Sequence, residues 1–381
     1  MSILINATNI KVGGGLQVAV SVIDSLLVNP RGESIYFVTS SKVYQQLSIP
    51  EEKLKNVFVC DFSFKNIFSF IKSYKYLNKL EKKFNISVAF TIFGPSYWHP
   101  VKAKHLIGFA NAWLVSPNSK AYTIFSSFIK WKQKVKNYIL RKLLFKKKAV
   151  YVTETLDMQE QFCKVFKCEK DKISVVGNCI SQHFIESFEE TDKYGLRDIK
   201  KFKFVTISHN YPHKNLKTIP LVGQQLERNG FDFTFIVTID FAEYELLDRE
   251  FKKYTTNIGP IDIVDCKAVY KACDALYLPT LIECFTVSYL EAMASNTLIL
   301  TSDLPFARNI CSDSAFYFNP YSVNDISKVL DTVLREFYIN SQLIHFKKSL
   351  YPQILLESGD NDTKVDSYMA IIKKLKGSLN V

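Results

Sequence analysis

Residues 275–305 read ALYLPTLIECFTVSYLEAMASNTLILTSDLP, which is the pattern of a buried strand, a loop, a helix and a second buried strand. Two strands joined by a helix are typical of a parallel sheet, because parallel neighbours need a long crossover connection. Strand-like runs at FKFVTI and FTFIVTI precede this stretch. We predict helices beginning near Lys214, Ala242, Lys267 and Phe285, and therefore a Rossmann-like α/β domain in the second half of the chain.

The first half of the chain shows the same alternation. Strand-like runs occur at SILINA, SIYFVTS, NVFVCD, VAFTIF, HLIGFA and AVYVT, and a helix is predicted over about 16–27. A chain of 381 residues suits two domains better than one core. We therefore predict an α/β fold with two Rossmann-like domains facing across a cleft. The predicted boundaries are 1–180 for the first domain, 181–200 for a linker, 201–355 for the second domain and 356–381 for a C-terminal helix.

The composition is that of a globular chain, with 47% hydrophobic and 23% charged residues. The eight cysteines are scattered without CxxC pairs or matching histidine spacing, which predicts neither a zinc site nor a disulfide framework. No apolar run reaches the roughly 18–20 residues needed to cross a bilayer, and the first residues lack the build of a signal peptide. These features predict a cytoplasmic protein.

The net charge of +12 is concentrated in one part of the chain. No acidic residue lies between Glu81 and Glu154, whereas 14 Lys and Arg residues do. Within this part, the segment 122–148 has apolar side chains spaced three and four apart, namely Ile124, Phe128, Trp131, Val135 and Tyr138. Cationic side chains fall largely off this stripe, namely Lys130, Lys132, Lys134, Lys136, Arg141 and Lys142.

Three interpretations of segment 122–148 are open. Such a helix can lie on an anionic membrane surface, with its apolar stripe in the interface and its lysines near the headgroups. It can also be an ordinary helix whose stripe faces the core and whose lysines are solvated. The third interpretation is a grip on single-stranded nucleic acid, since basic residues alternate with aromatic ones.

Two glutamates in the opening stretch are candidates for binding a ligand. In open α/β sheets, ligands bind beyond the carboxyl ends of the strands. Glu283 comes just before the predicted helix, and Glu291 is predicted about two turns into it, some 10–12 Å further along at about 1.5 Å per residue. A nucleoside-diphosphate sugar has a comparable length, so one carboxylate can accept from sugar hydroxyls and the other from ribose hydroxyls. Alternatively, Glu283 is a solvated loop residue and Glu291 pairs with a nearby lysine.

Phosphate groups also have candidate partners. The backbone amides of Cys284, Phe285, Thr286 and Val287 lie at the predicted helix start, where free N–H groups favour an anion. Lys214, in HNYPHKNLK, is predicted at the opening of another helix and can stabilise charge on a departing diphosphate.

Gly13, Gly14 and Gly15 follow the first predicted strand and let the backbone approach a ligand, although a simple tight turn explains them equally well. The triplet matches neither the GxGxxG fingerprint nor the P-loop pattern, which argues against nicotinamide and ATP sites.

ECFTVSYLEAMA resembles the Glu-x7-Glu element of the retaining family-4 glycosyltransferases, which have the GT-B architecture. The order of parts fits over nearly the whole chain, from GGG through HKNL to the two glutamates and the TSDLP loop. NATNIKVGGGLQVAVS and TIFGPSYW further resemble a bacterial subgroup that acts in surface-polysaccharide synthesis, such as O-antigen or capsule assembly.

The resemblance implies a role for each matching residue. Glu283 would contact the donor sugar, Glu291 the ribose, Lys214 the diphosphate, and Gly13–Gly15 the phosphate side from the first domain. The C-terminal helix would cross back to the first domain.

The chain departs from the family pattern at two places. The arginine that often lies six positions before the lysine is replaced by Ser208, and the histidine expected around 109–111 is missing. Polar and aromatic residues could line the acceptor site instead, namely Tyr97, Trp98, His99, Asn111 and Trp113.

The resulting hypothesis is a retaining glycosyltransferase that moves a sugar from a nucleoside-diphosphate sugar to a lipid-linked saccharide, on the inner face of the plasma membrane. In such enzymes the leaving diphosphate helps to remove the acceptor proton, so we expect no metal, no cofactor and no nucleic-acid partner. A nucleotide-sugar epimerase of the same architecture explains everything except the basic segment. A nucleic-acid-binding protein explains only the charge.

Overall fold

The structure is a computed structural model that describes residues 2–11, 13–62, 66–185, 192–339 and 341–378. The chain forms two compact units of nearly equal size, each containing one parallel sheet. The first unit comprises residues 1–117, 131–179 and 360–381, and the second comprises 118–130 and 180–359. The predicted linker 181–200 includes residues 186–191, which lie outside the described part of the chain.

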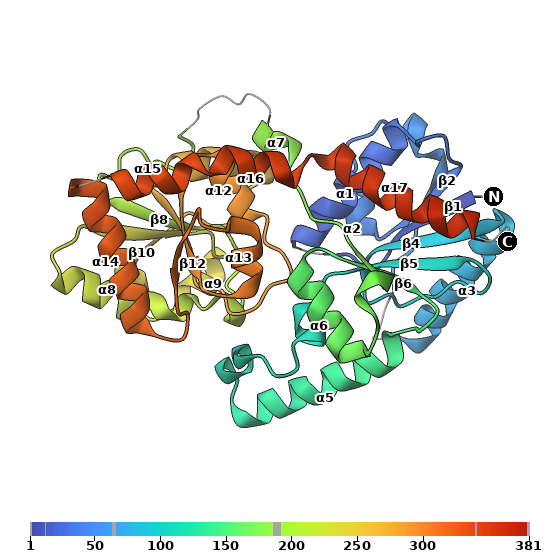
Figure 1. Ribbon diagram of the computed structural model, residues 1–381, viewed down its shortest axis with the longest axis horizontal. Coiled ribbons are helices and arrows are strands. Elements are labelled where there is room, and N and C mark those ends of the chain that lie inside the picture. Colours follow the sequence, from blue (N-terminus) through green and yellow to red (C-terminus); the bar gives the residue numbers. More distant parts are fainter. Residues whose placement is uncertain (1, 12, 63–65, 186–191, 340, 379–381) are drawn as a thin grey trace. The chain divides into compact units, whose positions relative to one another are not determined.

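The first unit contains a seven-stranded parallel sheet of order β3-β2-β1-β4-β5-β6-β7 (Figure 1). Its strands are β1 Ser2–Ala7, β2 Ile35–Thr39, β3 Val57–Val59, β4 Ile86–Gly94, β5 Lys104–Phe109, β6 Val150–Thr153 and β7 Ile173–Val175. Successive side chains of a strand point to opposite faces. On β1, Ile3 and Ile5 join one hydrophobic cluster while Leu4 joins another, so both faces of this sheet are covered.

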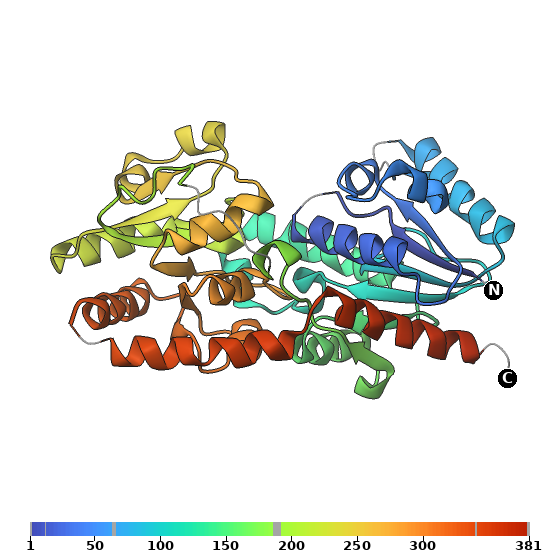
Figure 2. The same cartoon turned by 90° about the horizontal axis from the view of Figure 1, so that it is seen from above.

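The helices of the first unit divide between those two faces. They are α1 Gly14–Val28, α2 Ser41–Tyr44, η1 Glu51–Asn56, α3 Ile67–Lys83, α4 Ala112–Val115, α5 Ser127–Leu144, α6 Leu156–Phe166, η3 Lys170–Lys172 and α17 Asn361–Gly377, where η marks a 3-10 helix. The division between the two units falls within α5, after Lys130. The clusters place α1 and α17 on the face of Ile3, and α3 on the face of Leu4. Helices α1 and α17 therefore pack against the same face although they come from opposite ends of the chain (Figures 1 and 2).

The C-terminal helix belongs to the core of the first unit. Val365, Tyr368, Met369 and Ile372 of α17 are buried in the same cluster as α1. The predicted helix 356–381 is divided between the end of α16 (Tyr351–Ser358) and α17, because Gly359 has a φ of 66° and ends the first helix. The side chain of Asp360 then caps α17 by accepting from the N–H of Thr363.

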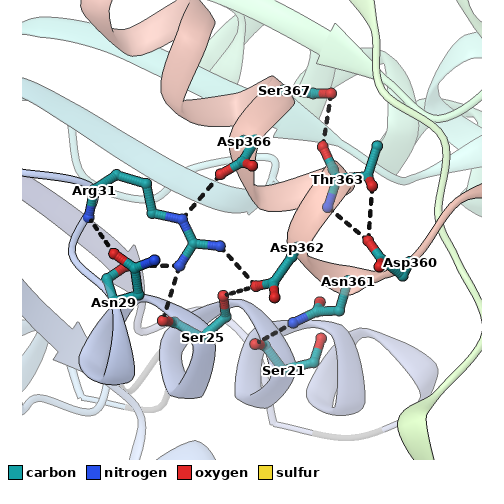
Figure 3. Close-up of polar contacts among 10 residues, drawn as sticks. All are labelled: Ser21, Ser25, Asn29, Arg31, Asp360, Asn361, Asp362, Thr363, Asp366 and Ser367. Carbon is teal, nitrogen blue, oxygen red and sulfur yellow. Dashed lines mark hydrogen bonds and ion pairs between the residues drawn. The ribbon is translucent and has the colours of Figure 1, made fainter.

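Arg31 links α17 to the end of α1 through hydrogen bonds (Figure 3). Its guanidinium donates to Asp362 at 2.6 Å and to Asp366 at 2.9 Å, and it also donates to the backbone carbonyls of Ser25 and Asn29. The Arg31 side chain is only 12% exposed, whereas both aspartates are largely exposed. Four acceptors on two segments thus hold one guanidinium in a fixed geometry.

The second unit contains a six-stranded parallel sheet of order β10-β9-β8-β11-β12-β13. Its strands are β8 Phe202–Thr206, β9 Phe233–Val237, β10 Thr255–Asn257, β11 Ala275–Leu278, β12 Leu298–Ser302 and β13 Phe316–Phe318. Its helices are η2 Lys120–Ile124, α7 Gln182–Ile185, η4 Pro212–Lys214, η5 Leu216–Thr218, α8 Ile219–Arg228, α9 Phe241–Glu245, α10 Arg249–Tyr254, α11 Ile263–Lys271, α12 Ser288–Ala294, α13 Pro305–Cys311, α14 Val323–Ile339, α15 Gln342–Ser349 and α16. Helices α8 and α14 pack on one face of the sheet, and α11, α12 and α16 on the other.

The basic helix α5 does not bury its apolar stripe. Four of the predicted stripe residues, Phe128, Trp131, Val135 and Tyr138, are between 38% and 72% exposed, and Asn137 is the residue of this helix that is buried. The interpretation of a core-facing stripe therefore does not hold. The predicted stripe member Ile124 lies in η2, before α5 begins.

Polar contacts attach α5 to α4, since Asn137 donates to the carbonyl of Trp113 and Arg141 to that of Leu114. Among the described residues, no helix combines the length and the apolar character that a membrane span requires.

Candidate active site

The carboxyl ends of two neighbouring strands in the second unit bring Lys214 and Glu283 together. Strands β8 and β11 pair in parallel, so the loops that follow them leave the same edge of the sheet. Lys214 lies in η4 after β8, and Glu283 lies in the loop after β11. The helix predicted near Lys214 begins only at Ile219, because two short 3-10 turns come first.

Lys214 and Glu283 form a close ion pair. The Nζ of Lys214 donates to Oε1 of Glu283 at 2.6 Å, and the Oγ1 of Thr280 donates to the same oxygen at 3.1 Å. The two charged side chains are only 13% and 16% exposed. Glu283 is therefore not the solvated loop residue of the alternative interpretation, because its carboxylate is partnered and mostly buried.

Two residues that the sequence analysis did not select complete this cluster. The carbonyl of His213 accepts from the N–H of Leu281 at 2.8 Å, which ties the two loops together. This carbonyl also lies 3.2 Å from Oγ1 of Thr280, whose single proton is shared between it and Glu283. The Nε2 of His213 lies 3.9 Å from Oε1 of Glu283. Burial lowers the pKa of His213. Two features of the sequence point to these residues. Thr280 lies at the end of a predicted buried strand, and His213 directly precedes Lys214.

Glu291 is a buried carboxylate on α12. Its Oε2 accepts from the Oη of Tyr270 at 3.4 Å, and burial raises the pKa of Glu291 to about 7. No lysine is within ion-pair distance among the described residues, so the alternative pairing of Glu291 with lysine is wrong. Glu291 instead lies where the neutral carboxyl is favoured.

Helix α12 begins at Ser288 and not near Phe285, so Glu291 lies in its first turn and not two turns along. The backbone N–H of Glu291 donates to the carbonyl of Val287, as expected for a residue in the first turn of the helix. The preceding residues are in irregular structure, because Glu283 turns back to Lys214 and Thr280. The helical rise used to predict the separation of the two glutamates therefore does not apply to the residues before α12.

The other predicted donor-site residues of the second unit lie in these same loops. Cys284 and Thr286 are buried, whereas Phe285 and Val287 are half-buried. Ser208 follows β8, its N–H donates to Oγ1 of Thr238, and its hydroxyl donates to the carbonyl of His209. Their contacts with a donor stay predictions.

The glycine triplet lies at the start of α1 in the first unit. Gly13 has a φ of 75°, a backbone conformation that favours glycine, and a Cβ at Gly13 or Gly14 would meet no atom within 4 Å. Gly15 is closer to its surroundings, with the ring of Phe93 at 3.4 Å from an ideal Cβ. The role of Gly13–Gly15 in phosphate binding stays a prediction.

The predicted acceptor residues make contacts within the first unit, and their role in acceptor binding stays a prediction. Trp98 is fully buried and its Nε1 donates to Asn78, while half-buried Tyr97 packs beside it. Nδ1 of His99 lies 3.2 Å from Nδ1 of His105. The side chain of Asn111 caps α4 by accepting from the N–H of Leu114.

No group of three or more His, Cys, Asp or Glu side chains with metal-site geometry occurs in the described ranges. The expected independence from metal stays a prediction, and so does the absence of a cofactor.

Known proteins that are similar to this chain include several glycosyltransferases. Residues 187–344 match the family described as glycosyl transferases group 1. The O-antigen chain mannosyltransferase RfbU of Salmonella typhimurium is 24% identical over 192 residues, covering 49% of this chain and 52% of that protein. The chain thus spans about half the length of the curated relatives that it matches.

Solved structures share the fold over almost the whole chain. A glycosyltransferase from Rickettsia africae aligns with a TM-score of 0.73 and 14% identity, covering 98% of each chain. Anabaena HepE in complex with UDP-glucose aligns with a TM-score of 0.71 and 13% identity, covering 98% of this chain and all of the other. The chain therefore has the GT-B fold, and its residues 187–344 are similar to the glycosyl transferases group 1 family.

Proposed function

We propose that this protein is a retaining glycosyltransferase that moves a sugar from a nucleoside-diphosphate sugar to a lipid-linked saccharide in bacterial surface-polysaccharide synthesis. The observation that carries the proposal is the Lys214–Glu283 pair at the carboxyl edge of the second sheet, inside the family-matching segment. The names of the relatives support the substrate class, since RfbU is an O-antigen mannosyltransferase and HepE was solved with UDP-glucose.

In the proposed donor complex, Lys214 pairs with the diphosphate and no longer with Glu283. Lys214 then stabilises the charge that develops as the bond between the sugar and the phosphate oxygen breaks. Glu283, released from the lysine, accepts hydrogen bonds from hydroxyls of the donor sugar, and Glu291 accepts from the ribose. Residues 284–287 follow Glu283 in the loop after β11 and contribute backbone donors to the phosphates. Ser208, in the loop after β8, offers its hydroxyl, because its N–H already donates to Thr238.

The proposed transfer needs no protein nucleophile. The bond from the anomeric carbon to the phosphate oxygen breaks while the acceptor oxygen bonds to the same face of the sugar. The acceptor proton passes to the leaving diphosphate. Configuration is thereby retained, and we propose that the reaction runs without a bound metal ion.

We further propose that α5 holds the enzyme on the anionic inner face of the plasma membrane. Its exposed apolar side chains, with no acidic residue between Glu81 and Glu154, fit a surface of anionic headgroups. A lipid-anchored acceptor stays at that surface, so peripheral binding raises the rate at which enzyme and acceptor meet.

The test is incubation of the purified protein with radiolabelled nucleotide sugars and membranes that contain lipid-linked saccharides. We expect label in the lipid fraction, dependent on Glu283, with the anomeric configuration of the donor retained. Release of an epimerised sugar, or no turnover with any donor of a broad panel, would overturn the proposal.

A further inference from the structure

We propose that His213 is a positioning residue for Glu283, and that it holds this carboxylate toward the donor sugar when the diphosphate takes Lys214. The inference rests on the proposed function. It adds one residue to the donor site and gives a reason for the order of histidine and lysine in this loop.

Three side chains converge on one oxygen of Glu283. Oε1 accepts from Lys214 at 2.6 Å and from Thr280 at 3.1 Å, and the Nε2 of His213 lies 3.9 Å from it. We find no partner for Oε2 among the residues that the structure describes. The protein thus contacts the carboxylate through Oε1, and Oε2 is the oxygen that can accept a hydrogen bond from a ligand hydroxyl.

The contacts of Glu283 change when Lys214 binds a diphosphate, since Oε1 then loses its hydrogen bond from Lys214, which is its shortest contact. Thr280 alone supplies one neutral hydrogen bond. The Nε2 of His213 is too far from Oε1 of Glu283 for a hydrogen bond between these two atoms, but a shift of about 1 Å brings the pair within the usual N–H···O range. His213 can therefore replace Lys214 as the second donor to Oε1.

The surroundings of His213 suit this role. Its ring is stacked on Tyr211, with centroids 5.6 Å apart and planes 10° from parallel, which limits its orientation. Its backbone carbonyl is fixed by Thr280 and Leu281. Burial lowers the pKa of His213 and so favours the neutral imidazole, which can donate to the carboxylate in the tautomer that carries its proton on Nε2.

A positioning role predicts a specific pattern of binding. Loss of the imidazole should weaken the contact between Glu283 and the sugar, and it should leave the contact between Lys214 and the diphosphate intact. The affinity for a nucleotide sugar should therefore fall, while the affinity for the corresponding nucleoside diphosphate should not.

The experiment compares dissociation constants of the full-length protein for UDP, UDP-glucose, UDP-galactose, GDP and GDP-mannose by titration calorimetry. The variants are His213→Ala, His213→Gln and, as a control in the same loop, His209→Ala, whose side chain is exposed. We expect His213→Ala to bind the preferred nucleotide sugar about tenfold more weakly, as for loss of one hydrogen bond to a charged group. Binding of the free diphosphate should be unchanged, His213→Gln should recover part of the loss through its amide donor, and His209→Ala should behave as the wild type.

Thermal unfolding of each variant separates a positioning role from a folding defect. Equal weakening of diphosphate and nucleotide sugar, or no weakening by His213→Ala, would overturn the inference while leaving the proposed function in place. If the wild-type protein binds none of these ligands and transfers no sugar, the proposed function fails, and the inference with it.

Discussion

The phenol of Tyr270 faces the carboxyl group of Glu291 inside the second unit, with Oη 3.4 Å from Oε2. Both side chains are buried. Burial raises the pKa of Tyr270 well above its ordinary value, so the phenol stays protonated and donates, and burial raises the pKa of Glu291 to about 7. The free protein therefore holds Glu291 in a place where its ionised form is disfavoured, and ribose hydroxyls would relieve that cost in the proposed complex.

This arrangement predicts a stability that depends on pH. The folded pKa of Glu291 is about 7 and the ordinary value is 4.5, so the folded state binds more protons in this range. The contribution of Glu291 is favourable below about pH 4.5 and is lost as the pH rises through about 7, by roughly 3 kcal/mol. Glu291→Gln should unfold like the wild type at pH 4.5 and at a higher temperature than the wild type at pH 8. A difference between the two proteins that does not change with pH would contradict the burial argument.

Both glutamates should be needed for turnover. Glu283→Gln and Glu291→Gln remove charge-assisted hydrogen bonds to donor hydroxyls without much change in volume, and each should reduce kcat/KM by about 10- to 100-fold. Glu250→Gln, at an exposed position of α10, is the control. Steady-state transfer rates test this prediction, and normal turnover in both site variants would refute the assignment of the donor site.

Arg31→Ala should destabilise the first unit by about 1–2 kcal/mol, because it removes contacts to two aspartates and two backbone carbonyls. Lys172→Ala removes an ion pair with Glu169 in which the two side chains are 68% and 67% exposed, and it should cost much less than Arg31→Ala. Urea unfolding of both variants measures the difference. Equal effects would mean that the contacts of Arg31 add nothing beyond an ordinary surface pair.

Membrane binding through α5 should be sensitive to salt. Changing Lys130, Lys132, Lys134 and Lys136 to Gln removes roughly 1 kcal/mol per charge near an anionic surface, so sedimentation with anionic vesicles should fall sharply. The control changes four exposed lysines of α3 to Gln, namely Lys72, Lys75, Lys79 and Lys82. If both quadruple variants sediment like the wild type, or if neutral vesicles bind as well as anionic ones, α5 is an ordinary solvated helix.

Transfer should persist in EDTA, because the proposed mechanism neutralises the diphosphate with Lys214 and backbone amides. Rates measured with EDTA and with added Mn²⁺ or Mg²⁺ should agree. A strict requirement for either ion would show that the donor site includes a metal.

The sequence predicts the fold because its strong signals are local. Buried strands such as β8 and β11 stand out as apolar runs between helices. Strands β10 and β13 were not predicted, since each has three residues and shows no clear alternation. The sequence pattern places the start of α12 three residues too early, because helix propensity does not show that the Glu283 side chain turns back to pair with Lys214.

The candidate site was predictable as a set of residues but not as a geometry. Glu283, Glu291 and Lys214 follow from the motif, whereas the ion pair joins loops 69 residues apart and depends on the pairing of β8 with β11. Burial was the least predictable property. Trp98 was expected to line an acceptor site and is fully buried, whereas the apolar stripe of α5 is exposed.

The central claim is that Lys214 and Glu283 form the binding site for a nucleoside-diphosphate sugar. Titration calorimetry with UDP- and GDP-sugars on the wild type and on the double variant Lys214→Met with Glu283→Gln tests it directly, because the double variant leaves neither charge buried without its partner. We expect the wild type to bind at least one of these donors, and the folded double variant to bind it at least about 100-fold more weakly. Equal affinity of the two proteins for that donor would contradict the claim.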